Sequence, residues 1–190
     1  KRNQLASTNA FTMHITDPAD LAGLPGFVKD MAAQAAAEKE LEGWLFDLSA
    51  PSYSGFMKYS DNRDLREKYY RAYNRRAYGD EWDNTATIQR IVELRYKKAT
   101  LLGYKDFSDY QTERRMAKSG DAVLEFIGEL MDPALPVAKT EVKNLNDFAK
   151  SKGFEGDIIM PWDFSYWAEK LRVEKYDLNV EETKPYFRLE

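Results

Sequence analysis

Apolar side chains recur three and four residues apart along most of this chain, which is the spacing that one face of an α-helix produces. The clearest series lies between residues 135 and 149 and consists of Leu135, Ala138, Val142, Leu145 and Ala149. Such a series suits packing against a neighbouring helix. We therefore predict a mainly α fold, a multi-helix array that forms one body over residues 1–190 with at most one short pair of strands.

Glycine, proline and capping residues mark where the expected helices begin and end. The predicted helices cover residues 17–23, 27–41, 62–78, 84–102, 107–118, 119–131, 135–152 and 163 onward. Residues 44–48 are the best candidate for a strand, because this short aromatic stretch lies between Gly43 and Pro51. Its partner strand lies elsewhere in the chain or is missing.

Two of the expected helices have apolar faces that we predict to be buried. The two faces comprise Ile88, Ile91, Val92, Ala99 and Leu102 in the first helix and Val123, Ile127, Leu130 and Met131 in the second. Pro133 and Pro136 follow the second helix, so we expect a break or a sharp kink near residues 133–136.

Composition excludes several classes of function. The 190 residues contain no Cys and a single His, His14, which excludes a disulfide framework, a thiolate zinc site, a cysteine nucleophile and any site that needs two histidines. We interpret His14 as a structural or exposed histidine. The formal net charge of −4 argues against a nucleic-acid partner. No apolar run approaches the roughly 18 residues of a membrane span.

The clusters of charged residues are best interpreted as solvated surface, and one catalytic alternative stays open. The acidic side chains of Glu38, Glu40 and Glu42 suit a solvated surface. The arginines of residues 66–76 lie among tyrosines, which indicates a solvated helix with a tyrosine core stripe rather than a nucleic-acid surface. No Glu-x-x-His motif of a di-metal bundle occurs. A carboxylate pair acting as acid and base stays open, because such a pair is formed in space.

The stretch from Pro161 to Lys170 is more aromatic than one buried helix stripe requires. Its opening suits the first turn of a helix, since Asp163 would lie near the positive helix end. Either this helix is buried on most sides, or its aromatic side chains line a cleft.

Several stretches of the chain, taken together and in order, resemble the thimet-oligopeptidase family of zinc peptidases, and most closely the bacterial peptidyl-dipeptidases (dipeptidyl carboxypeptidases). The stretches are residues 20–25, 62–66, 94–104, 115–119, 160–167 (Met-Pro-Trp-Asp-Phe-Ser-Tyr-Trp), 172–178 and 184–187. Trp162, Asp163 and Tyr166 match a Trp-Asp-x-x-Tyr helix of the family. This resemblance implies that they have cleft-lining or lobe-packing roles.

The resemblance implies a larger, two-lobed helical peptidase that releases C-terminal dipeptides from short oligopeptides and lies in the cytoplasm or the periplasm. Its zinc site would be His-Glu-x-x-His plus a later glutamate. One histidine cannot form that motif, so no catalytic or metal residue is carried over to this chain. Lys1 in place of Met and the uncapped end at Glu190 fit a piece of a longer protein. We expect zinc in the parent but not in this piece, which would be inactive alone.

Two further expectations concern partners. The rest of the same polypeptide and oligopeptide substrates are the partners that the resemblance implies. A piece separated from its parent would also expose apolar surface, so we expect self-association around Trp162, Phe164 and Trp167. The alternative function is a non-catalytic helical module whose aromatic helix binds a peptide or protein.

Overall fold

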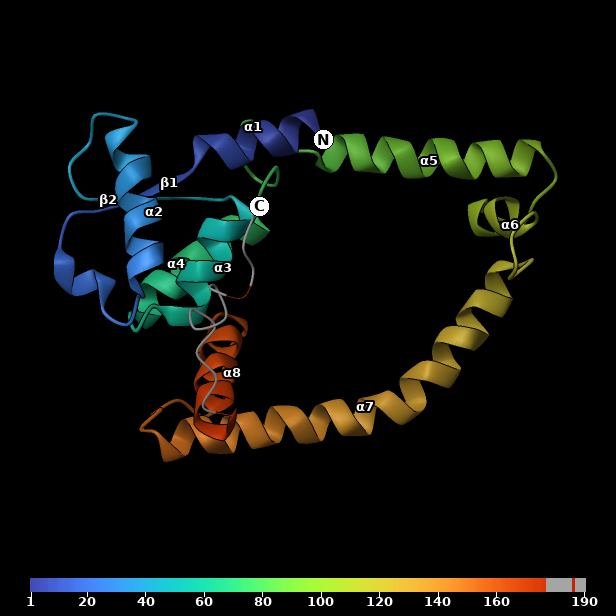
Figure 1. The fold of residues 1–190 in the computed structure, drawn as a ribbon. Coiled ribbons are helices and arrows are strands. Elements are labelled where there is room, and N and C mark those ends of the chain that lie inside the picture. Colours follow the sequence, from blue (N-terminus) through green and yellow to red (C-terminus); the bar gives the residue numbers. More distant parts are fainter. Residues whose placement is uncertain (177–185, 187–190) are drawn as a thin grey trace.

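The computed structural model describes residues 1–176 and residue 186, and within them it is mainly helical, as predicted (Figure 1). The elements in chain order are α1 (Arg2–Ala10), β1 (Thr12–Ile15), the 3₁₀ helix η1 (Pro18–Leu21), α2 (Gly26–Ala37), β2 (Trp44–Asp47), α3 (Ala50–Tyr59), α4 (Arg63–Asn74), α5 (Thr85–Leu101), α6 (Phe107–Thr112), α7 (Gly120–Ser151) and α8 (Pro161–Tyr176). No helix in this part of the chain is both long and apolar enough to cross a membrane.

The predicted strand is confirmed as β2, and its partner is β1. The two strands pair antiparallel, with Met13 opposite Phe46 and Ile15 opposite Trp44. Met13, Ile15 and Phe46 are buried, whereas the side chains between Met13 and Ile15 and before Met13 are exposed. This alternation anchors a two-stranded ribbon on α2, since a pair of strands is not stable without a packed face.

Elements α2 to α4, both strands and α8 form a compact body with two adjoining clusters of buried side chains. In the larger cluster, Phe46 packs edge-on against Phe56, and Phe56 against Tyr69, with ring centroids 4.8 and 5.4 Å apart. The smaller cluster joins the end of α7 to α8 and includes Leu145 and Trp167. Helix α8 therefore links the body to the returning end of α7.

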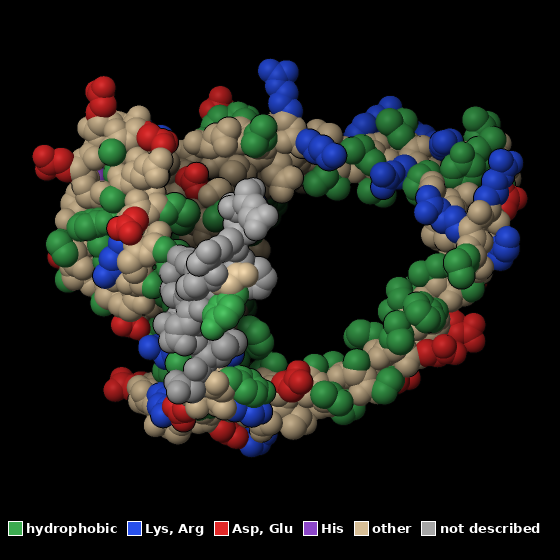
Figure 2. All heavy atoms as spheres, viewed as in Figure 1, with side chains coloured by type: hydrophobic (Ala, Val, Ile, Leu, Met, Phe, Trp, Pro, Cys, Tyr) green, Lys and Arg blue, Asp and Glu red, His purple; other side chains and the backbone are tan. Residues whose placement is uncertain are grey.

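Elements α5, α6 and α7 form an arm that leaves the body and returns to it at α8 (Figure 1). Figure 2 shows open space between the arm and the body. The predicted burial of the two apolar faces is largely wrong, since Ile88 is 58% and Leu130 is 55% exposed, although Ala99 is buried. Helical spacing identifies an apolar face but does not supply the element that covers it, and the main described partner of α5 is the short α6.

Of the break or sharp kink expected near residues 133–136, the break does not occur, because α7 continues as one helix through Pro133 and Pro136. Figure 1 shows its axis changing direction where the colour passes from yellow to orange. A proline removes one N–H and crowds the preceding turn, which a helix can accommodate by bending. The predicted helices 27–41, 62–78 and 107–118 end earlier than expected, at Ala37, Asn74 and Thr112. Near the expected ends, Glu40, Ala77 and Lys118 adopt positive φ values of 56°, 56° and 67°.

Candidate functional site at the start of helix α8

Local sequence sets the first turn of α8. Pro161 occupies its first position, where a missing N–H costs no helix hydrogen bond. The Asp163 N–H donates to the Met160 carbonyl oxygen at 2.8 Å, and the Met160 N–H donates to Asp163 Oδ2 at 3.1 Å. These reciprocal bonds resemble a capping box and hold the Asp163 carboxylate at the helix N-terminus.

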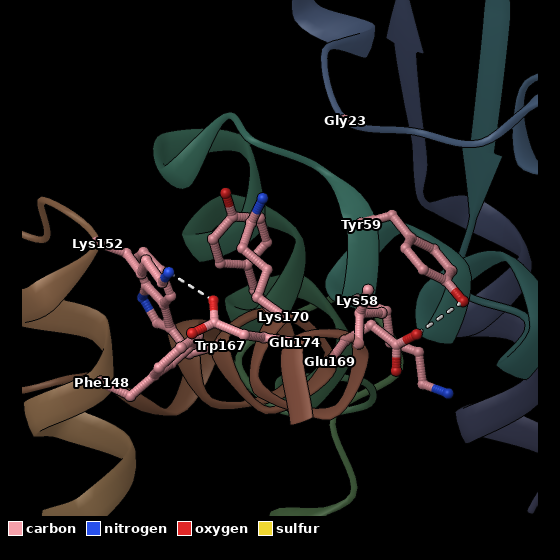
Figure 3. A pocket seen from close by; sticks show the side chains of 11 residues that line it. Gly23, Lys58, Tyr59, Phe148, Lys152, Trp167, Glu169, Lys170 and Glu174 are labelled. Atoms are coloured by element: carbon pink, nitrogen blue, oxygen red, sulfur yellow. Dashed lines mark hydrogen bonds and ion pairs between the residues drawn. The ribbon is translucent and has the colours of Figure 1, made fainter. Parts of the chain in front are cut away.

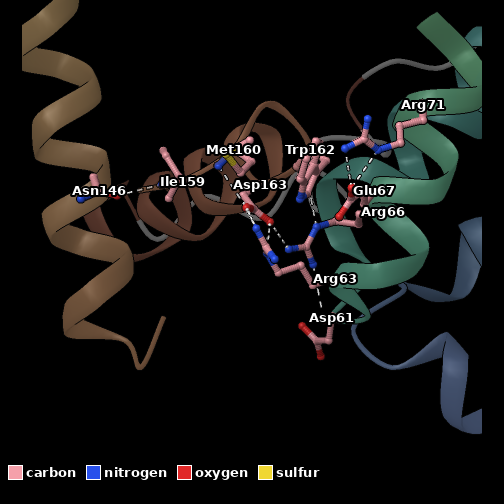
Figure 4. A network of polar contacts seen from close by, with 10 residues as sticks. All are labelled: Asp61, Arg63, Arg66, Glu67, Arg71, Asn146, Ile159, Met160, Trp162 and Asp163. Atoms are coloured by element: carbon pink, nitrogen blue, oxygen red, sulfur yellow. Dashed lines mark hydrogen bonds and ion pairs between the residues drawn. The ribbon is translucent and has the colours of Figure 1, made fainter. Parts of the chain in front are cut away.

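Two arginines of α4 bind the Asp163 carboxylate (Figure 4). Arg66 Nη2 donates to Oδ1 at 2.9 Å, and Arg63 Nη2 donates to Oδ2 at 2.9 Å. The side chains of Asp163 and Arg66 are 0% and 2% exposed, whereas Arg63 is partly exposed. Hydrogen bonding to Asp163 raises the pKa of Arg63 above its ordinary value. The result is a buried ion pair that joins α4 to α8.

Arg66 is bound on every side. Its Nε donates to the Trp162 carbonyl at 3.1 Å, and its Nη1 donates to the Ser60 carbonyl at 2.7 Å. The Tyr166 ring lies 4.1 Å from its guanidinium carbon. The interpretation of this arginine as solvated is therefore wrong. Sequence reasoning missed its role because its carboxylate partner lies 97 positions later in the chain.

The aromatic residues of α8 divide between the interior and the surface. Trp162 packs beside the Tyr70 ring and beneath the Arg71 guanidinium, and Trp167 packs against Phe148 and Phe154. Only Phe164, of the three residues expected to mediate self-association, is exposed. The expected apolar surface at Trp162 and Trp167 is thus wrong, because the body and α7 cover both indoles within the chain.

A groove of about 900 Å³ lies where α3, α7 and α8 meet (Figure 3). Tyr166 is the one candidate residue that lines it, and Trp162 and Asp163 lie outside its lining. The Tyr166 hydroxyl donates to Asp61 Oδ1 at 2.7 Å. Burial, and then the hydrogen bond to Asp61, raise the pKa of Tyr166.

Most of the charged side chains along this groove are paired within the chain. Glu169 binds Arg172 at 2.6 Å and accepts from the Tyr59 hydroxyl at 3.4 Å. The hydrogen bond from Arg172 lowers the pKa of Glu169. Two further ion pairs at the groove join Lys152 to Glu174 and Lys170 to Asp61.

The described residues offer little for catalysis. The two most buried carboxylates, Asp163 and Glu169, are each held by arginine, so they do not form the open acid–base pair left as an alternative. No group of three His, Cys, Asp or Glu side chains within residues 1–176 could hold a metal ion, and the residues there do not fit a zinc site. His14 is exposed, and its Nε2 lies 2.6 Å from the Glu42 carbonyl oxygen.

Comparison with known proteins supplies what the geometry lacks. The profile of a family described as peptidase family M3 matches residues 56–190, which include both arginines and the start of α8. The chain is 40% identical to a probable cytosolic oligopeptidase A of Arabidopsis thaliana, with 98% of this chain and 28% of the relative aligned. It is 38% identical to oligopeptidase A of Escherichia coli (97% and 28% aligned). It is 35% identical to dipeptidyl carboxypeptidase of the same bacterium (97% and 27% aligned). The chain thus spans little more than a quarter of these relatives.

Proposed function

The chain belongs to peptidase family M3, and we propose that it forms part of a zinc metallopeptidase that cleaves short oligopeptides and releases C-terminal dipeptides. The observation that carries this proposal is the identity of 35–40% to oligopeptidases and a dipeptidyl carboxypeptidase over 97–98% of the chain. Dipeptide release is the narrower part, and the dipeptidyl carboxypeptidase relative supports it. A cytoplasmic location is proposed with it, in line with the Arabidopsis relative, which is described as cytosolic.

Residues 1–190 scaffold a lobe and part of its cleft in this proposal and are not sufficient for hydrolysis. The single histidine cannot form His-Glu-x-x-His, so the zinc ligands would come from the remainder of the parent protein. Trp162 and Asp163 have a lobe-packing role, which their burial against α4 supports. Tyr166 packs in the same way and also lines the groove.

The binding-module alternative has less support. It needs an aromatic surface on α8 to receive a peptide or protein, yet Trp162 and Trp167 pack inside the chain. The exposed Phe164 alone offers a small contact.

Hydrolysis of blocked peptides by the full-length protein tests the proposed function. We expect zinc-dependent cleavage that a chelator abolishes and added zinc restores, with dipeptides as the products identified by mass spectrometry. The 190-residue chain, assayed beside it, should be inactive and free of stoichiometric zinc. Cleavage that a chelator leaves untouched, or hydrolysis by the 190-residue chain, would overturn the proposal. Longer C-terminal products would overturn dipeptide release alone.

A further inference from the structure

The arm carries large apolar side chains that nothing in residues 1–176 covers. Helix α5 and the first half of α7 account for most of them, and in Figure 2 many line the opening between the arm and the body. Representative exposed side chains are Ile88, Val92, Leu94 and Leu101 on α5 and Phe126 and Leu130 on α7.

The apolar side chains of α5 lie on two nearly opposite sides. Ile88 and Val92 are four residues apart and share one face, and Leu94 and Leu101, seven apart, share another. Each residue advances a helix by about 100°, so Leu94 lies about 200° from Val92. A helix that is apolar on opposite sides is typical of one that is buried all round.

Packing within the described chain does not stabilise such a helix. The 17-residue α5 packs mainly against the six-residue α6, and Leu101 at its end is 87% exposed. Most of the stability of a helix in a protein comes from tertiary packing of its apolar face. The arm therefore requires a covering partner on both sides.

Charge indicates the chemistry of that partner. Helix α5 carries four basic residues and one acidic residue, and the first part of α7 carries four acidic residues and no basic one. The α5 charges are Arg90, Glu93, Arg95, Lys97 and Lys98, and those of α7 are Asp121, Glu125, Glu129 and Asp132. A complementary partner presents acidic groups around its apolar contacts with α5 and basic groups around those with α7.

We propose that the arm is an internal docking surface for the same polypeptide, covered by the part of the parent that corresponds to the uncovered three quarters of the relatives. This inference rests on the proposed function, in which the chain is part of a longer peptidase. A second copy is the poorer occupant, because a two-fold contact buries one self-complementary patch and leaves the opposite side of α5 exposed. Relatives of which this chain covers 27–28% carry enough additional polypeptide to cover both sides.

Hydroxyl-radical footprinting of the full-length protein tests this surface without reference to peptidase activity. Met131 lies on the arm and is 52% exposed, whereas Met57 lies in the body and is 3% exposed. We expect the oxidation rates of Met131 and Met57 to be lowered by a similar factor relative to the urea-unfolded protein. This factor should not depend on protein concentration. Oxidation of Met131 at the unfolded rate beside a protected Met57 would overturn the proposal. Protection that appears only as concentration rises would assign the surface to a second copy and would overturn it equally.

A matched pair of variants gives a second readout. Leu130→Asp places a charge on the proposed contact, and Asp30→Asn changes an exposed position on α2 of the body, away from the arm. In the full-length protein, Leu130→Asp should lower the Tm by several degrees and increase the oxidation of Met131, while Asp30→Asn should change neither. Equal behaviour of the two variants would contradict a covered arm.

Discussion

At the scale of single residues, the buried Arg66–Asp163 pair is the most consequential contact of this chain. Removing two charges from water is unfavourable unless their mutual attraction and further hydrogen bonds compensate. Here the carboxylate also binds Arg63 and the Met160 N–H, and the guanidinium also binds two carbonyl oxygens. Because these partners come from separate segments, the pair fixes how α8 lies on α4.

Replacing Asp163 with Asn should strongly destabilise the folded chain. Arg66 would keep its buried position but lose its charged partner, and breaking a buried pair in this way typically costs about 3 kcal/mol or more. Urea denaturation measures the free energy of unfolding. The matched control is Asp157→Asn at an exposed position, which should change this free energy by less than about 0.5 kcal/mol. Equal stability of the two variants would show that the pair has no structural role.

Glu169 gives a prediction about pH. Its pKa is lower in the folded chain because Arg172 hydrogen-bonds to it. A carboxylate of this kind stabilises the fold above its unfolded pKa, and this stabilisation is lost as pH falls through the folded pKa. Glu169→Gln should therefore be less stable than the parent chain at pH 7, by about 1 kcal/mol. Its deficit should shrink as pH falls below about 4.3, the ordinary glutamate pKa.

Thermal unfolding of the two proteins between pH 3 and pH 7 measures this deficit. Glu155→Gln, at an exposed position, serves as the control, and its Tm should equal that of the unsubstituted chain at every pH. A deficit of Glu169→Gln that stays constant across this range would mean that the Arg172 contact does not act through charge.

At the scale of elements, Gly23 forms the turn between η1 and α2. It adopts φ of 81°, and a Cβ there would lie 2.3 Å from the Tyr59 carbonyl oxygen at the end of α3. Gly23→Ala should therefore cost about 1–3 kcal/mol, from backbone strain and the clash with backbone. Gly26→Ala is the matched control, because no atom lies within 4 Å of its Cβ. Urea denaturation should show no loss of stability for this control, and a neutral Gly23→Ala would contradict the close approach.

Capping residues, glycines and prolines predicted the positions of helices and strands well, but the sequence did not predict which side chains these elements bury. Asp17 caps η1 as its position before Pro18 indicated, and its side chain accepts from the Ala19 N–H at 2.9 Å. Such caps, like the glycines and prolines at other boundaries, act over a few residues and are readable in the sequence. The burial of Arg66, by contrast, depends on Asp163, which sequence spacing alone does not place beside it.

The arm shows the same limit in a different form. Helical spacing gave the correct position of α5 but not its exposure, because the burial of a face depends on the elements around it. The candidate site behaved similarly. Trp162, Asp163 and Tyr166 came from a resemblance, and only the fold distinguishes the packed Trp162 and Asp163 from Tyr166, which also lines the groove.

At the scale of the whole molecule, the compact body and the open arm have different tasks in the proposed peptidase. The body has two clusters of buried side chains and the buried Arg66–Asp163 ion pair, as expected of a rigid scaffold. The arm exposes apolar side chains on opposite sides, as expected of a segment that other parts of a larger protein cover. Tyr166 packs within the body and also lines the groove, so a substitution of this residue can distinguish a packing role from a catalytic one.

The kinetics of full-length Tyr166→Phe, expressed per bound zinc, therefore test the scaffolding role most directly. This change removes the hydroxyl that donates to Asp61 and keeps the ring that packs on Arg66. A scaffolding role predicts a lower Tm with kcat within about threefold of the parent enzyme. A fall in kcat of about 100-fold or more, with zinc content and Tm unchanged, would instead identify Tyr166 as a catalytic acid or base and contradict the scaffolding role.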